Sequence, residues 1–96
     1  MMSLETVRGK RGRLLDLAAR HGVRNVRVFG SVARGEADAA SDLDLLVDLE
    51  PGRSLIDLGA LLVDLEAELG ASVDLVTEAG LRPALRERVL RDAVPL

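Results

Sequence analysis

The stretch that decides the fold runs from Gly30 to Glu50 and reads GSVARGEADAASDLDLLVDLE. A Gly-Ser pair opens it, and after ten further residues Asp42 and Asp44 flank a leucine at the start of an apolar segment. Side chains two residues apart on a strand point to the same face, so a strand here would place both carboxylates together. At ~5 Å and an effective dielectric near 20, two unit charges repel by roughly 3 kcal/mol. The pair is therefore expected to need a cation, or a strand less buried than its apolar neighbours indicate.

A third acidic side chain, Asp74, lies in a later apolar segment, Ser72–Val76. If that segment is a strand beside the one that begins at Asp42, the three carboxylates form one cluster. Mg²⁺ is a hard cation that binds one or two carboxylates together with waters and substrate phosphates. A plainer interpretation stays open at this point, because two aspartates on a strand are also common on solvated faces.

A turn that could hold a phosphate precedes the acidic pair. Gly30 and Ser31 follow a predicted strand, Val23–Phe29, and the glycine would let the backbone approach a phosphate. The Ser31 hydroxyl and the free N–H groups of the following turn can donate to phosphate oxygens. Arg34 can add a charge to a triphosphate or pair with a neighbouring acid. Ser41 can contact the nucleotide or form a hydrogen bond at the strand end.

Periodicity predicts the order α-β-(α)-β-α-β-α, an α/β fold in which helices pack on a small mixed sheet. Glycine and proline punctuate the chain, and Ser54 and Pro83 are expected to begin the last two helices. The helices are predicted at about 3–21, 32–35 and 54–70 and from residue 83, and the strands at 23–29, 42–49 and 72–76. The residues expected to face the core are Leu43, Leu45 and Val47 on a strand, Leu55, Leu58, Leu61, Leu62, Leu65 and Leu69 on one helix, and Leu85, Val89 and Leu90 on the last. His21 and Asp48 are expected to have structural roles, at a helix end and at the exposed end of a strand.

Composition narrows the class of protein. A chain of 96 residues is expected to form a single domain over 1–96 with a modest core. Phe29 is the only aromatic residue and the net charge is −3, so neither a stacking platform for bases nor a basic footprint for direct nucleic-acid binding is present. The chain has no cysteine, no apolar run long enough for a membrane span and no secretory h-region, so a cytoplasmic protein without a membrane contact is expected.

These residues resemble a known family. Gly30-Ser31, Asp42-x-Asp44 and the later Asp74 are similar to the DNA polymerase β-like nucleotidyltransferase superfamily. More narrowly, the stretch from Gly30 to Glu50 and the downstream VDLVTEAGLRPALRERVLRDAV resemble the minimal nucleotidyltransferases (MNT), many of which act as antitoxins beside a HEPN-domain toxin. The resemblance covers essentially the whole chain.

The resemblance implies a role for each motif residue. Gly30 and Ser31 would hold the β- and γ-phosphates of ATP, and Asp42 and Asp44 would bind two Mg²⁺ ions. Asp74 would bind the ion nearer the nucleophile and help to activate the incoming hydroxyl. Two ions clamp the attacking and leaving oxygens during in-line attack on the α-phosphorus, so positioning and charge neutralisation supply most of the catalysis.

The expected activity is therefore Mg²⁺-dependent transfer of AMP from ATP to a hydroxyl, with a tyrosine of a HEPN toxin as acceptor, in a type VII toxin–antitoxin pair. The chain is too short for an acceptor domain, so the acceptor surface would come from a partner or a second copy in a homo- or hetero-oligomer. Two alternatives stay open. One is an antitoxin that neutralises its toxin by binding alone, and the other is a nucleotidyltransferase for a small molecule such as an aminoglycoside.

Overall fold

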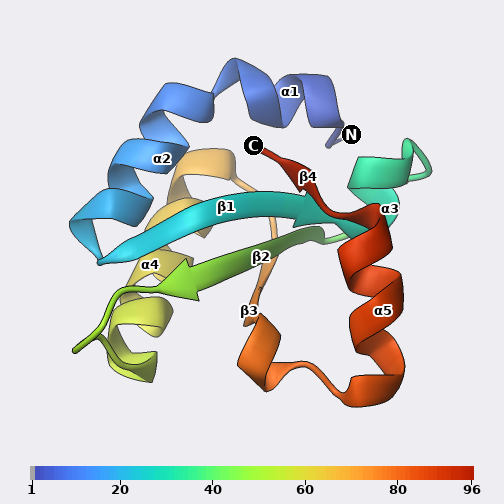
Figure 1. Ribbon diagram of the computed structural model, residues 1–96. Helices are drawn as coiled ribbons and strands as arrows, with labels where there is room; N and C mark the ends of the chain where they lie inside the picture. Colours follow the sequence, from blue (N-terminus) through green and yellow to red (C-terminus); the bar gives the residue numbers. More distant parts are fainter. Residues whose placement is uncertain (1) are drawn as a thin grey trace.

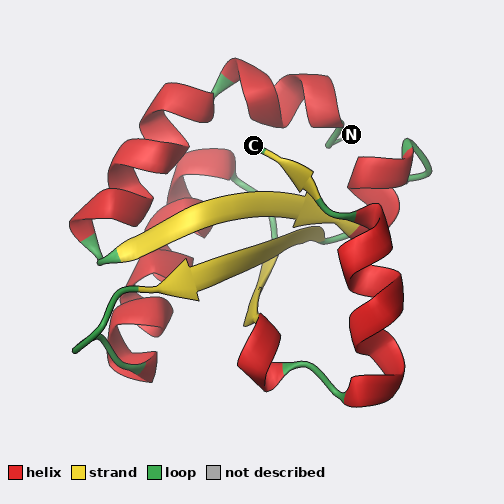
Figure 2. Cartoon of the chain, viewed as in Figure 1, coloured by secondary structure: helices red, strands yellow, loops and turns green. Residues whose placement is uncertain are grey.

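A four-stranded sheet in the order β3-β2-β1-β4 forms the centre of the computed structural model, which describes residues 2–96 (Figure 1). β1 runs antiparallel to β2 and β4, whereas β2 and β3 are parallel, so the predicted mixed sheet with packed helices is confirmed (Figure 2). The strands are β1 (Val23–Phe29), β2 (Leu43–Leu49), β3 (Val73–Thr77) and β4 (Val94–Pro95). The helices are α1 (Leu4–Gly9), α2 (Arg11–Arg20), α3 (Gly30–Arg34), α4 (Leu55–Leu69) and α5 (Pro83–Asp92), with a 3₁₀ turn η1 (Glu78–Gly80).

The two faces of the sheet bury different apolar groups. On one face Leu43, Leu45 and Val47 of β2 are at most 1% exposed and pack in the main core with side chains from α1, α2 and α4, as the alternation predicts. On the other face Leu46 forms a second, smaller cluster with Phe29 and with Val89 of α5. The second face is the one that carries Asp44, because alternate residues of β2 share a face.

The N-terminal segment is two helices, so the prediction of one helix over 3–21 is wrong. Lys10 joins α1 to α2 with φ −105° and ψ 12°, outside the helical region, and Gly9 and Gly12 beside it have little helix preference. The Lys10 ammonium donates to the carbonyl of Glu68 at 3.1 Å. The break lets Val7 of α1 bury itself completely over the sheet while α2 follows a different direction (Figure 1).

The long helix α4 begins and ends where the sequence predicts. The Ser54 hydroxyl accepts from the Ile56 N–H, the Asp57 carboxylate accepts from the Ser54 N–H, and Gly70 ends the helix in the left-handed region. Of the predicted leucine stripe, Leu61 and Leu65 are buried and Leu58, Leu62 and Leu69 are partly buried against the core. Leu55 is predicted in the core but is 76% exposed; it is the first residue of α4.

The last helix α5 starts at Pro83 as predicted, but it buries only one of the three residues expected to face inward. Val89 is 9% exposed, whereas Leu85 and Leu90 are 46% and 39% exposed. α5 contacts the sheet through a narrow strip, and its Leu85 side stays open to solvent. After α5 the chain returns as β4, a short strand beside β1 that the sequence pattern does not predict.

His21 ends α2, and its Nε2 lies 2.7 Å from a carboxylate oxygen of Asp64, which ties α2 to α4 and agrees with the structural role expected for it. No helix within residues 2–96 is long and apolar enough to cross a membrane.

Candidate functional site

The junction of β1 and α3 brings Gly30 against the carboxylate of Asp44. Gly30 has φ +71°, in the left-handed region that favours glycine, and it follows Phe29, the register partner of Asp44 in the antiparallel pair. A Cβ atom at position 30 would overlap the Asp44 Oδ2 atom. Position 30 therefore requires glycine for two reasons: its backbone conformation favours glycine, and a side chain there would overlap Asp44.

Asp44 and Asp74 lie side by side on the parallel strands β2 and β3. Their Cα atoms are register partners, and neighbouring strands are separated by about 4.8 Å. Register partners point to the same face, so the predicted meeting of these two carboxylates follows from the sheet topology. Asp42 lies in the loop immediately before β2 and is exposed.

The negative charges of Asp74 and Asp42 act on Asp44. Partial burial, then the negative charges of Asp74 and Asp42, raise the pKa of Asp44 from 3.8 to about 6, while the positive charge of Arg34 opposes the rise. An ionised Asp44 is therefore costly in the free chain. A bound cation would remove that cost by neutralising the repulsion.

The donors present fit magnesium, although the side chains do not form a cage. Within residues 2–96, no three acidic or histidine side chains stand close enough together to hold a metal ion. Asp42, Asp44 and Asp74 offer hard carboxylate oxygens, the donors that Mg²⁺ prefers. Mg²⁺ also keeps waters and binds substrate phosphates, so it does not require a preformed cage of protein ligands. A shared ion would need these side chains to turn toward one another, and the three-ligand site stays a prediction.

Arg34 is engaged with two acids. Its Nε lies 3.0 Å from Glu36 Oε2 and its Nη1 lies 2.6 Å from Asp92 Oδ2, and these contacts raise the pKa of Arg34. Of the two roles expected from the sequence, the structure shows the pairing with acids. The Asp92 pair joins α3 to the end of α5, a contact between residues 58 positions apart that local sequence could not reveal.

The two serines predicted to bind nucleotide lie in different surroundings. Ser31 is in the first turn of α3, directly after Gly30, and is partly buried. The Ser41 hydroxyl accepts from the Asp38 N–H at 3.0 Å and donates to Asp38 Oδ1 at 3.2 Å, which is the strand-end role also expected for it. Ser41 lines a hollow with Thr6 and Leu69, and that hollow does not include Gly30.

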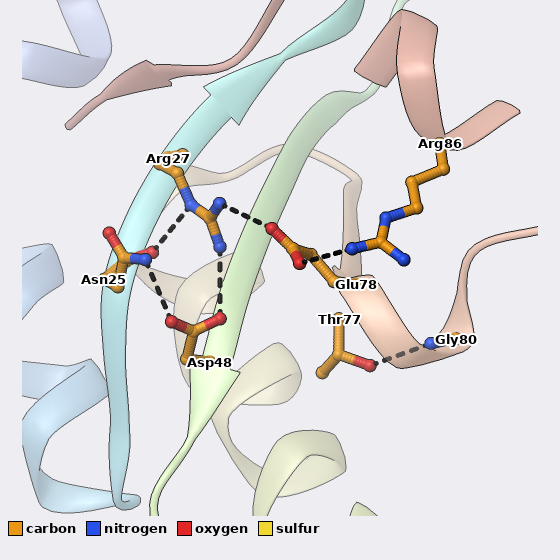
Figure 3. A network of polar contacts seen from close by, with 7 residues as sticks. All are labelled: Asn25, Arg27, Asp48, Thr77, Glu78, Gly80 and Arg86. Carbon is orange, nitrogen blue, oxygen red and sulfur yellow. Dashed lines mark hydrogen bonds and ion pairs between the residues drawn. The ribbon is translucent and has the colours of Figure 1, made fainter. Parts of the chain in front are cut away.

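A polar network fixes the strands that carry the acids (Figure 3). Arg27 is only 15% exposed and lies between Asp48 at 3.1 Å and Glu78 at 3.3 Å, which confirms a structural role for Asp48. The register of β1 shifts just before Arg27, and Asn25 in that bulge has φ +53° and donates to Asp48 at 2.9 Å. The network thereby joins β1 and β2 to the end of β3.

The same network reaches the last helix. Glu78, in the turn that follows β3, also accepts from Arg86 of α5 at 3.4 Å. Below it in the same turn, the Thr77 hydroxyl accepts from the Gly80 N–H at 3.2 Å (Figure 3). The only local sign of this network in the sequence is Arg27, an arginine among apolar residues of β1. The sequence does not show that its partners are Asp48 and Glu78.

Beside Gly30, the structure contains a groove of about 240 Å³ that the sequence does not predict. It lies between α5 and the β1–α3 junction, and α5 supplies most of its residues. Its lining residues are Phe29, Gly30, Arg34, Leu85, Arg88, Val89 and Asp92. Gly30 lines this groove and also lies against the carboxylate of Asp44, so the groove and the acidic pair share this residue.

Comparison with known proteins places this geometry in a family. Residues 11–96 match the family described as a nucleotidyltransferase domain. The chain belongs to this family and is an enzyme of the nucleotidyltransferase class. More particularly, it is 47% identical over 79 residues to protein adenylyltransferase MntA of Thermococcus cleftensis. The aligned region covers 82% of this chain and 80% of that protein.

Solved structures agree with the family. A structure provisionally described as a minimal nucleotidyltransferase is 60% identical, covers 99% of this chain and 97% of its own, and has a TM-score of 0.87. A complex of a tri-AMPylated HEPN toxin of Shewanella oneidensis with its MNT antitoxin matches with a TM-score of 0.68 at 19% identity, over 92% of this chain and 69% of that one. At that identity the second likeness shows the fold alone.

Proposed function

We propose that the chain transfers AMP from ATP to a hydroxyl group, a tyrosine, of a HEPN-domain toxin and so serves as the antitoxin of a type VII toxin–antitoxin pair. One observation carries the proposal. Asp44 and Asp74 are register partners beside Gly30, and the pKa of Asp44 is raised to about 6 by burial and by its acidic neighbours. Two neighbouring carboxylates of this kind favour a site for a divalent cation and a phosphate ester.

The relatives support the acceptor and the partner. MntA, at 47% identity, is named a protein adenylyltransferase, and the Shewanella oneidensis complex pairs an MNT antitoxin with an AMPylated HEPN toxin. These relatives are named for a protein acceptor, which favours a protein partner that presents its own hydroxyl over a small-molecule acceptor.

Asp42, Asp44 and Asp74 would hold the two Mg²⁺ ions, and Gly30 and Ser31 would hold the distal phosphates. The ions would neutralise charge on the triphosphate and activate the attacking hydroxyl. The chain itself has three tasks: its sheet fixes Asp44 and Asp74 in register, Gly30 keeps the space beside Asp44 open, and the β1–α3 turn brings Ser31 next to that space. Most of the rate enhancement is then positioning and electrostatic stabilisation.

The test is transfer to the partner. The purified chain is incubated with ATP, Mg²⁺ and the HEPN protein encoded beside it, and the intact mass of the HEPN protein is measured. We expect one or more added AMP groups with wild type. Because a metal site depends on its anionic ligands, we expect none with Asp44→Asn or Asp42→Asn. Glu87→Gln removes one negative charge from an 83% exposed side chain and should label like wild type.

Two results would contradict the proposal in different ways. Labelling that survives both aspartate substitutions would mean that the acids do not carry the reaction. An Asp44→Asn protein that protects growth from the toxin as well as wild type would show that binding alone neutralises it. The small-molecule alternative is tested separately, by a mass-spectrometric search for adenylylated aminoglycosides.

A further inference from the structure

The groove beside Gly30 contains a cation that the rest of the protein does not use. Arg88 of α5 lines the groove, and it takes part in none of the ion pairs formed among residues 2–96. Its neighbours on α5 differ, because Arg86 pairs with Glu78 at 3.4 Å and Arg91 pairs with Glu87 at 3.2 Å. An unpaired guanidinium at the edge of a groove is free to bind an anion there.

The other cation in the groove is compensated. Arg34 lies between Glu36 and Asp92 at 3.0 and 2.6 Å, and both acids neutralise its charge. The Arg34–Asp92 pair holds the end of α5 against α3, and the Arg86–Glu78 pair holds the start of α5 against the turn after β3. Arg88 lies between these two anchored points, so its Cα position is fixed, while its side chain forms no ion pair with any residue from 2 to 96.

The groove adjoins the place where the proposed function puts the reacting phosphate. Gly30 lines the groove and also contacts the carboxylate of Asp44, so the two sites share one wall. An α-phosphorus held near Asp44 and Asp74 leaves the β- and γ-phosphates to extend along Gly30. Leu85 and Arg88 line the same groove as Gly30.

We propose that Arg88 binds the phosphate chain of the nucleoside triphosphate and that the α5 groove is the phosphate arm of the nucleotide site. The inference rests on the proposed function, because it takes a nucleoside triphosphate at Asp44 as the ligand. It assigns Arg34 a different task, that of a positioning residue that holds α5 in place through Asp92. The planar guanidinium of Arg88 suits bidentate contact with phosphate oxygens.

The experiment compares nucleotide binding by matched arginine variants of the full chain. Arg88→Ala removes the proposed contact, Arg88→Lys keeps the charge, and Arg91→Ala removes an arginine of the same helix that is paired with Glu87 and does not line the groove. Two probes are used: MgATP by calorimetry, and inorganic tripolyphosphate by displacement of a fluorescent ATP analogue. Thermal unfolding checks that each variant is folded, and Arg88→Gln replaces Arg88→Ala if the alanine variant does not fold.

Arg88→Ala should weaken both MgATP and tripolyphosphate by roughly tenfold, the effect of losing one charged hydrogen bond. It should also flatten the dependence of binding on salt concentration, because one ionic contact fewer is made. Arg88→Lys keeps the charge but loses the guanidinium fork, so it should recover only part of the affinity. Arg91→Ala should bind within about twofold of wild type.

Three outcomes would overturn the proposal. Equal binding by Arg88→Ala and Arg91→Ala would remove Arg88 from the site. Weaker MgATP with unchanged tripolyphosphate would place Arg88 on the base or ribose instead of the phosphates. A wild-type chain that does not bind MgATP at all would refute the proposed function and this inference together, whereas the first two outcomes leave the proposed function intact.

Discussion

Replacing Asp44 by asparagine should stabilise the free protein at neutral pH. The pKa of Asp44 is raised from 3.8 to about 6, which means that the folded state holds the proton more tightly than the unfolded chain does. The free energy of unfolding must therefore fall as the pH rises from about 4 to about 6, and it stays lowered above that range. Asparagine carries no charge and removes this cost.

The magnitude follows from the size of the shift. A change of 3.8 to about 6 corresponds to about 3 kcal/mol at 1.36 kcal/mol per pKa unit. Asp44 is only partly buried, and solvent screening reduces the effect to about 1–2 kcal/mol. For a domain of this size such a gain raises the melting temperature by about 5–10 °C.

The assay is thermal unfolding of wild type, Asp44→Asn and the control Glu87→Gln at several pH values between 4 and 8, with a chelator present. The gap between Asp44→Asn and wild type should be widest above pH 6 and should nearly close at pH 4, where Asp44 is protonated in the folded state and begins to be protonated in the unfolded chain. Glu87→Gln changes an exposed residue and should stay within about 0.5 kcal/mol of wild type throughout. A gap that is absent at pH 7.5, or that is the same at pH 4 and pH 7.5, would refute the reasoning about burial and repulsion at this site.

Three other changes have defined outcomes. Gly30→Ala should destabilise the fold by about 1–2 kcal/mol and abolish MgATP binding, because φ is +71° and the new methyl group overlaps the Asp44 carboxylate. Its control, Gly59→Ala, has open space around it in α4 and should stabilise the protein by about 0.5–1 kcal/mol in the same melts. Mg²⁺ should raise the melting temperature of wild type but not that of Asp44→Asn, and equal shifts would mean that the ion binds elsewhere. Arg27→Met should cost about 1–3 kcal/mol in urea unfolding, since it leaves two acids without their partner, whereas Arg91→Met at an exposed pair should cost less than about 1 kcal/mol.

The parts of the fold that the sequence predicts correctly are those with local signals. β1 has the bounds Val23–Phe29 in prediction and structure, because an alternating segment between Gly22 and Gly30 can hardly be interpreted otherwise. The start and end of α4 follow from the capping serine and the closing glycine. The juxtaposition of Asp44 and Asp74 was predicted on the condition that their strands pair, and the parallel register satisfies that condition.

What the sequence does not predict depends on contacts between distant residues. Leucine spacing identifies a helix face but not which residues of that face other elements cover, so Leu55 and Leu85 are predicted in the core but are exposed. From the sequence, Arg34 could either contact a triphosphate or pair with an acid. Its ion pair with Asp92 joins residues far apart in the chain, so the sequence does not predict it. The groove that contains Arg88 forms where α5 packs against the end of β1. No local sequence pattern predicts that packing.

The most direct test of the central claim is a crystal structure of the chain with a non-hydrolysable ATP analogue and Mn²⁺, which stands in for Mg²⁺ and can be located by its anomalous signal. The account predicts a metal peak bound by carboxylate oxygens of Asp44 and Asp74 and by a phosphate oxygen, with Asp42 turned toward the same site. A nucleotide bound elsewhere, or one bound here with no metal on Asp44, would contradict it.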